Sequence, residues 1–132
     1  MAHEHDVYML LTETAVNQRD PAAIQQYAGR LEPLAARDEH PLYQAIAHRA
    51  WGVAQRLAGD LPAAQARLAQ ALEMFTTLGA DWQAARTHLE LAEAASDPAA
   101  ARAHYTEALA AFEALGARPD ADRARAALQA LL

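Results

Sequence analysis

The stretch that decides the fold is ALEMFTTLGA at residues 71–80, because it returns as ALAAFEALGA at residues 108–117. The same offset of 37 residues aligns residues 49–86 with residues 86–123 and gives fourteen identical positions. Seven of these pair Ala with Ala, which an Ala-rich chain supplies by chance, but the other seven do not. A repeat of this length is typical of helical solenoids.

Helix-capping residues divide each repeat into two helices. Asp20 and Asp97 each stand directly before a Pro. This pair predicts a helix that is capped by the Asp and begins at the Pro. Asp60 occupies the equivalent position in the second repeat. Gly79 and Gly116 follow apolar runs, where a helix commonly ends in a left-handed glycine. These signals predict seven helices, over residues 5–18, 21–37, 42–58, 61–78, 82–95, 98–115 and 119–131.

Composition and hydrophobic spacing both favour an all-α fold. The 132 residues include 37 Ala and 17 Leu but only 11 Val, Ile and Thr together, so helix formers far outnumber strand formers. Within residues 61–78 and 98–115 the apolar positions recur at intervals of three, four and seven, as on one buried helix face. The predicted stripes are Ala64, Leu68, Ala71, Leu72, Phe75 and Leu78, and Ala101, Tyr105, Ala108, Leu109, Phe112 and Leu115.

The whole chain, residues 1–132, is predicted to form a single domain. Its parts are an irregular first repeat over residues 5–40, a second repeat over 42–79, a third over 82–116 and a C-terminal capping helix over 119–132. Gly29 and Pro33 fall inside a helix of the first repeat. Because Pro removes a backbone donor and crowds the preceding turn, we expect a kink or break near residues 29–33.

Charge and cysteine content argue against several classes of protein. The 11 basic residues are all Arg and are outnumbered by 17 acidic ones, which gives a net charge of −6. A negative net charge disfavours binding to nucleic acid, which is itself negatively charged. The absence of Cys excludes disulfides, thiol catalysis and Cys-ligated zinc. No apolar run reaches the length of a transmembrane helix, and the first residues lack the basic segment of a signal peptide. We therefore expect a cytoplasmic protein that binds neither nucleic acid nor membranes.

A set of small and capping residues in the second repeat follows a known pattern. Its members are Gly52, Gly59, Asp60, Ala64 and Ala71. Through them, residues 48–76 resemble the tetratricopeptide repeat. The longer period and the missing terminal Pro resemble the long-helix variety in the repeat arms of bacterial signal-transduction ATPases, adenylate cyclases and large transcriptional activators. The resemblance implies a right-handed superhelix of antiparallel helix pairs.

The resemblance also implies a function. In this family the first helix of each pair lines a concave groove that holds a peptide or helix of a partner protein, so a scaffold or regulatory arm without enzymatic activity or cofactor is implied. Trp82, at the start of such a helix, is a candidate for an exposed anchor. Carried onto this sequence, the groove positions are Arg49, Val53, Arg56, Gln83, Arg86, Glu90 and Arg123.

Three arginines share one position of the repeat. Arg49, Arg86 and Arg123 are spaced by 37 and 37 residues. A row of guanidinium groups suits carboxylates, because each presents a planar fork of donors, so one interpretation is a groove for an acidic or C-terminal peptide segment. The other interpretation is structural: each Arg packs between repeats and pairs with a nearby acid, for which Glu90 and Asp120 stand four and three residues away.

The histidines offer an alternative from another class, a metal-binding or enzymatic helical bundle. The run His3-Glu4-His5-Asp6 has donors that bind transition metals. However, residues two apart point to different sides of a helix, and we interpret this run as a solvated terminus. His88 takes the place of Trp51 in the repeat and is interpreted as a packed helix residue. We therefore expect no metal site and no catalytic residue.

Self-association is the alternative among binding functions. Ala124, Leu128 and Leu131 form a stripe on the final helix that is expected to cover the third repeat. If that stripe is poorly covered, it and Leu132 would form an apolar end that drives homodimer formation.

Overall fold

The computed structural model describes residues 3–131, and within that range the chain forms seven α-helices and no β-strand. The expected all-α fold is therefore confirmed, and every helix begins and ends within two residues of its predicted bounds. The helices are α1 (Glu4–Asn17), α2 (Pro21–Arg37), α3 (Pro41–Leu57), α4 (Leu61–Thr77), α5 (Asp81–Glu93), α6 (Pro98–Leu115) and α7 (Arg118–Ala130).

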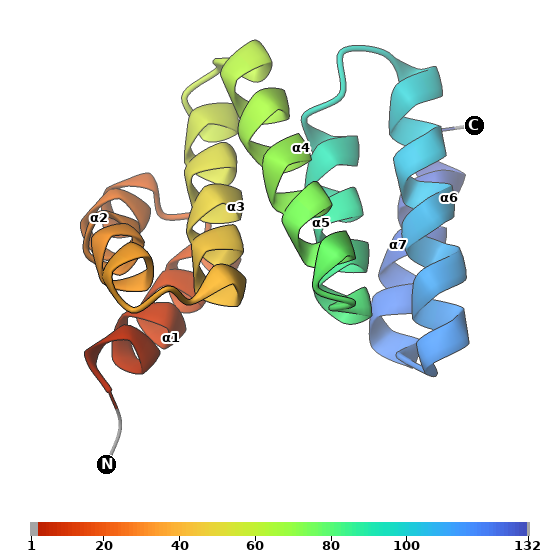
Figure 1. Ribbon diagram of the computed structural model, residues 1–132. Coiled ribbons are helices and arrows are strands. Elements are labelled where there is room, and N and C mark those ends of the chain that lie inside the picture. The colour runs from red at the N-terminus through yellow and green to blue at the C-terminus, as the bar shows by residue number, and fades with distance from the viewer. Residues whose placement is uncertain (1–2, 132) are drawn as a thin grey trace.

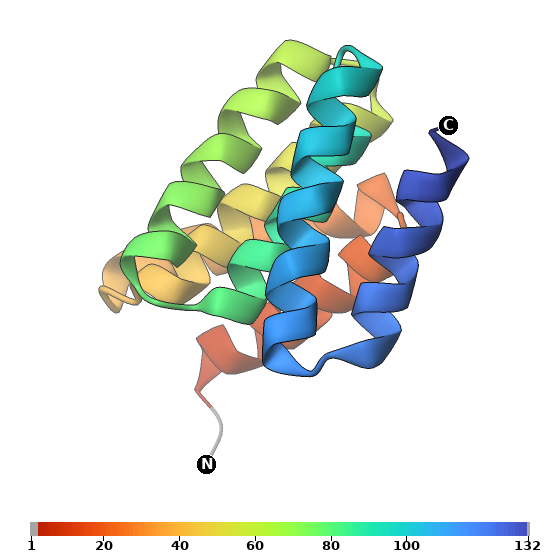
Figure 2. The ribbon, with the colours of Figure 1, turned by 90° about the vertical axis from the view of Figure 1, so that its right-hand side faces the viewer.

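Each helix packs against the next one along the chain, and α1 also contacts α3. Figure 1 shows this progression from α1 and α2 on the left to α6 and α7 on the right. Figure 2 shows α6 and α7 side by side and antiparallel at that end of the molecule. The helices thus follow one another in space in the order of the sequence.

The predicted capping residues lie at the helix ends. The carboxylates of Asp20, Asp60 and Asp97 accept hydrogen bonds from backbone N–H groups three residues on, at 3.2, 3.2 and 2.8 Å. Gly79 and Gly116 adopt left-handed backbone conformations, each with a φ of 69°. Since a left-handed conformation disfavours residues with a Cβ, these glycines end α4 and α6 without strain.

Of the kink or break expected near residues 29–33, the break is wrong, because α2 runs without interruption from Pro21 to Arg37. Pro33 and Gly29 both lie on the exposed side of α2. The Gly29 carbonyl, which loses its hydrogen bond at Pro33, is therefore open to water. The irregularity lies in the turns instead: Arg19 and Glu39 have φ values of 53° and 49° where the second repeat has glycine.

The predicted apolar stripes form the core, except at their last positions. Phe75 and Phe112 are completely buried, and the alanines of these stripes that precede them on α4 and α6 are buried as well. Leu78 and Leu115 were expected on the same stripes but are 43% and 46% exposed. Leu78 is the residue that caps the C-terminus of α4, and Leu115 is the last residue of α6, so both lie at helix ends.

Gly52 marks the closest approach of α3 and α4. A Cβ atom at this position would lie 2.6 Å from the Leu68 Cγ and 3.3 Å from the Ala64 carbonyl oxygen. Leu68 is completely buried, so it has no free space into which to move. The glycine of the tetratricopeptide-like pattern is therefore required here by packing.

Replacing Gly52 with Ala is expected to destabilise the protein by about 1–3 kcal/mol through overpacking. Gly29 provides a matched control, since it is also inside a helix but has no atom within 4 Å of an added Cβ. Gly29→Ala should stabilise the protein by about 0.5–1 kcal/mol, because Ala loses less backbone entropy in a helix. Urea unfolding measures both, and equal effects at the two positions would contradict the close approach.

Within residues 3–131, none of the helices combines the length and the apolar character needed to cross a lipid bilayer.

Candidate functional site

Side chains from α1, α3, α5 and α7, and from the turn after α1, meet on one surface of the protein, which we call the inner face. They are held together mostly by hydrogen bonds and ion pairs between helices. The inner face consists of Glu13, Asn17, Arg19, Arg49, Arg56, Trp82, Gln83, Arg86, Glu90, Glu93, Asp120 and Arg123.

Arg49 is the most deeply buried charge of the inner face, with 0% of its surface exposed. Its guanidinium donates to Glu13 Oε2 at 2.9 Å and to the Gln83 side-chain oxygen at 2.7 Å. It also donates to the Gln83 backbone oxygen at 3.1 Å and to the Thr87 hydroxyl at 3.3 Å. The Phe75 ring lies 4.9 Å from the guanidinium carbon. Arg49 therefore joins α1, α3, α4 and α5.

Burial and the Glu13 carboxylate act in opposite directions on the pKa of Arg49. Burial lowers the pKa of the Arg49 guanidinium, while the nearby Glu13 carboxylate raises it and Arg86 lowers it further. Because the ordinary pKa of Arg exceeds 12, the group stays charged at neutral pH. A buried charge of this kind is tolerated only when it is paired and hydrogen-bonded, and Glu13 with Gln83 meets that requirement.

Arg86 shares the same carboxylate but remains partly exposed. It donates to Glu13 Oε2 at 2.8 Å and to Asn17 Oδ1 at 3.2 Å. Its guanidinium carbon lies 5.0 Å from the centre of the Trp82 ring, within range of a cation–π interaction. Its side chain is 16% exposed. Arg86 therefore contacts α1 and the Trp82 ring, and a small part of its side chain borders the solvent.

A second ion-pair group links the end of α1 to α5. Arg19 donates to both oxygens of Glu90 at 2.9 Å and approaches Glu93 at 3.4 Å. Arg56 of α3 lies 3.2 Å from the same Glu93 carboxylate. Burial lowers the pKa of Arg19, but the hydrogen bonds to Glu90 and the negative charges of Glu90 and Glu93 together outweigh burial and raise that pKa overall. Glu90 is only 5% exposed, and both of its carboxylate oxygens accept hydrogen bonds from Arg19.

These two groups of ion pairs join α1 to α5 across α3. The resemblance implied that Arg49 and Val53 of α3 face an open groove, but both are completely buried. Arg49 is covered because Glu13 of α1 pairs with both Arg49 and Arg86 of α5. Val53 packs with Val16 of α1 and Ile24 of α2 in an apolar cluster, so it does not face a groove. The part of the inner face that can reach a partner therefore lies toward α5 and α7.

An open cavity of about 440 Å³ lies at that end of the inner face. Arg123 of α7 is exposed beside it and, among residues 3–131, has no hydrogen-bond or ion-pair partner. Trp82 is 42% exposed, and its indole N–H donates to the Asp120 carboxylate at 3.0 Å. The lining residues are Asn17, Arg19, Trp82, Arg86, Asp120 and Arg123.

The sequence placed the three repeated arginines on one face but assigned them wrong partners. Glu90 pairs with Arg19 instead of Arg86, and Asp120 accepts from Trp82 instead of Arg123. Each observed partner comes from another helix or turn, which the spacing of charges within one helix cannot reveal.

Two cavity residues, Asn17 and Arg19, escaped the sequence analysis altogether. Both lie where α1 ends and its turn begins, at repeat positions that the other units fill with different residues. No spacing or motif in the sequence singles them out.

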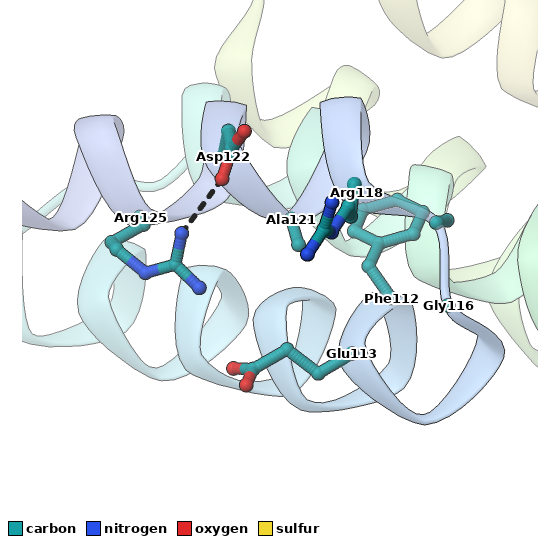
Figure 3. A pocket seen from close by; sticks show the side chains of 8 residues that line it. Phe112, Glu113, Gly116, Arg118, Ala121, Asp122 and Arg125 are labelled. Carbon is teal, nitrogen blue, oxygen red and sulfur yellow. Dashed lines mark hydrogen bonds and ion pairs between the residues drawn. The ribbon is translucent and has the colours of Figure 1, made fainter.

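A second cavity, of about 540 Å³, lies between α6 and α7 (Figure 3). Its charges are balanced: Arg118 and Arg125 are matched by Glu113 and Asp122, and Arg125 pairs with Asp122 at 2.8 Å. The inner-face cavity instead combines three arginines with one Asp. Electrostatics therefore favour the inner face as the site for an acidic ligand.

The histidines lie apart from the inner face. Near the N-terminus, His5 Nδ1 lies 2.6 Å from the Asp38 carboxylate. In the middle of the chain, His48 Nδ1 lies 2.7 Å from the Arg67 guanidinium. In the part of the chain that the structure describes, no three His, Asp or Glu side chains are placed to hold a metal ion.

The C-terminal stripe covers the last repeat in the way the sequence indicates. Ala124 is completely buried against the core formed by α5 and α6, and Leu128 and Leu131 are half-buried. Leu132, the remaining residue of the predicted apolar end, lies outside the described residues. Homodimer formation through this end stays a prediction.

Comparisons of the chain with protein-family models, characterised proteins and solved structures find no match.

Proposed function

We propose that the protein is a protein-interaction module that binds an acidic peptide segment of a partner in the inner-face cavity. The observation that carries this proposal is the local charge of the cavity. The whole chain has a net charge of −6, yet three of its 11 arginines line this one cavity beside a single Asp. A positive cavity in an acidic protein attracts a carboxylate to one place and repels it elsewhere.

Arg123 is the residue best suited to receive the ligand. Its guanidinium has five N–H donors, none of them used within residues 3–131. A carboxylate that binds Arg123 in a bidentate manner would also approach the open side of Arg86. Arg86 and Arg19 are already paired with Glu13 and Glu90, which compensate much of their charge, so Arg123 supplies the free positive charge of the cavity.

Trp82 supplies the apolar part of the site. Its ring is 42% exposed and is held by the hydrogen bond to Asp120 and by Arg86. An exposed Trp of fixed orientation is a common anchor in protein interfaces, because it buries a large area with little loss of entropy. Such a site fits a segment in which an acidic residue neighbours an apolar one.

The repeat pattern supports the wider proposal that the chain is a tetratricopeptide-like solenoid serving as a scaffold or regulatory arm. The helix pairs, the small residue at Gly52 and the cavity lined by first helices agree with that family's arrangement. On this proposal the partner is a protein, and no catalytic residue or cofactor is needed. A cytoplasmic location, proposed from the absence of Cys, suits this role.

A binding titration tests the proposed function. A fluorescein-labelled peptide of eight Glu residues is expected to bind the protein at low ionic strength, whereas the equivalent Gln peptide is not. Arg123→Glu should weaken binding of the Glu peptide about tenfold or more, since a lost charge pair of about 1.4 kcal/mol has that effect. Fluorescence anisotropy measures both affinities.

Arg102 provides the matched control for this titration. It is an exposed Arg on α6 that does not line the cavity, and Arg102→Glu changes the net charge by the same amount. Binding should be nearly unchanged in this variant. The proposal fails if Arg102→Glu weakens binding as much as Arg123→Glu, or if the Glu peptide does not bind the unaltered protein.

A further inference from the structure

A pair of histidines connects α5 and α6 on a part of the surface that the proposed function does not use. Nδ1 of His88 and Nδ1 of His104 lie 3.0 Å apart, with ring centres separated by 5.3 Å. Both side chains are partly buried. The two histidines are 16 positions apart, and the segment between them includes the turn from α5 to α6, so only the folded helix pair brings the two rings together.

Both imidazoles are held in the neutral form that can bind a metal. Burial lowers the pKa of His88 and of His104, the His104 ring lowers that of His88 further, and the Glu107 carboxylate opposes these effects in part. Without a metal, one ring donates its Nδ1–H to Nδ1 of the other. Metal binding requires that ring to carry its proton on Nε2 instead, which changes no charge.

The distance between the two nitrogens is close to that of two ligands on one metal ion. Two imidazole nitrogens at about 2.0–2.1 Å from a tetrahedral Zn²⁺ are about 3.3 Å apart. The observed 3.0 Å separation of the Nδ1 atoms is a few tenths of an ångström shorter. The two rings now face each other along a hydrogen bond, so ion binding also requires each ring to turn until both nitrogens point at the ion. Neutral imidazole is a favoured ligand of Zn²⁺ and other divalent transition metals.

A carboxylate and a solvent-filled opening lie beside this pair. Glu107 is exposed on α6, three residues after His104 and so on the same side of the helix. Glu107 and His88 both line a cavity of about 220 Å³ between α5 and α6, through which an ion could enter. In the present arrangement the three groups do not enclose an ion, so Glu107 has to rotate toward the rings.

We propose that His88 and His104, with Glu107 as a third ligand, form a binding site for a divalent transition-metal ion such as Zn²⁺. The two imidazoles are the fixed ligands, and water completes the coordination through the open cavity. A bound ion would cross-link α5 to α6. The site is separate from the inner-face cavity, so metal binding and peptide binding are tested independently.

Isothermal titration of the metal-free protein with Zn²⁺ alone tests the proposal. We expect one ion per chain, together with a rise in the thermal unfolding midpoint, because an ion that binds only the folded protein stabilises it. His88→Gln and His104→Gln should each weaken Zn²⁺ binding by tenfold or more. Glu107→Gln should weaken it less than either, since the imidazoles are the fixed ligands.

Two histidine variants outside the site serve as controls. His48→Gln removes a partly buried imidazole that faces Arg67, and His5→Gln removes one that faces Asp38. Both should leave Zn²⁺ binding unchanged. The proposal is overturned if the unaltered protein binds no Zn²⁺, or if His5→Gln abolishes binding while His88→Gln does not.

A measurement on the unaltered chain avoids any folding defect of the variants. Long-range ¹H–¹⁵N spectra of the histidine rings identify which nitrogen binds the ion. We expect Zn²⁺ to shift Nδ1 of His88 and His104 and to leave both Nε2 atoms protonated. Shifts confined to other histidines would overturn the site.

Discussion

Replacing Arg49 with Ala is expected to lower the free energy of unfolding by about 3–5 kcal/mol, the usual effect of breaking a buried ion pair. The side chain is completely buried, and it is the one group that contacts Glu13, Gln83 and the Phe75 ring together. Its loss leaves the Gln83 side-chain oxygen without its donor and opens a cavity between α3 and α5. Urea unfolding followed by circular dichroism measures the change.

Arg49→Met is the control that separates the effect of losing the Arg49 charge from the effect of losing its side-chain volume. Met fills much of the space of the Arg stem, and Glu13 keeps its ion pair with Arg86, so the loss should be smaller than for Ala. Arg123→Ala, at the equivalent repeat position, should change stability by less than about 0.5 kcal/mol because the residue is exposed. Equal effects at Arg49 and Arg123 would show that Arg49 has no special structural role.

Replacing Phe75 with Ala is expected to destabilise the protein by about 3–5 kcal/mol, as for other buried aromatic residues. Phe75 has 0% exposure and packs on Leu31, Ile46 and Ala71 in the core between α2, α3 and α4. Its ring also lies 4.9 Å from the Arg49 guanidinium carbon. The same denaturant experiment measures this change, with the slope of the unfolding curve confirming two-state behaviour.

Phe112 tests how much of that effect depends on Arg49. It occupies the repeat position equivalent to Phe75 and is equally buried, but its neighbours are apolar residues of α5, α6 and α7. Phe112→Ala should therefore combine additively with Arg49→Ala, whereas Phe75→Ala should not, because contacting residues are coupled. Additive effects for both pairs would contradict a contribution of the Arg49–Phe75 contact.

Local signals in the sequence were sufficient to predict the helices. Asp20, Asp60 and Asp97 cap the helices that the sequence assigns to them, and Gly79 and Gly116 are left-handed at the predicted ends. These signals act over three or four residues, so they hold whatever the rest of the chain does.

The predictions about the fold that are wrong concern residues whose surroundings outweigh the structure that the local sequence favours. Pro33 was expected to break α2, but the Gly29 carbonyl that it leaves unpaired is on the exposed side and the helix continues. Leu78 and Leu115 fit the apolar spacing but lie beyond the packed part of their helices. Hydrophobic spacing identifies the side of a helix that faces the core, and it does not indicate where along the helix the core ends.

The site was predicted less completely, because its chemistry depends on contacts between distant residues. The equal spacing of Arg49, Arg86 and Arg123 placed them on one face, yet they differ in burial. Glu13 lies 36 and 73 residues from its two arginine partners, and no local pattern links them. The same reason explains why the His88–His104 pair was missed.

The most direct test of the proposed site is an NMR titration of the unaltered protein with the peptide of eight Glu residues, observed at the arginine Nε–Hε groups. We expect the largest shift at Arg123, a smaller one at Arg86 and none at Arg102, in agreement with their positions relative to the inner-face cavity. The largest shift at Arg118 or Arg125, which line the other cavity, would contradict the proposal. So would the absence of any shift.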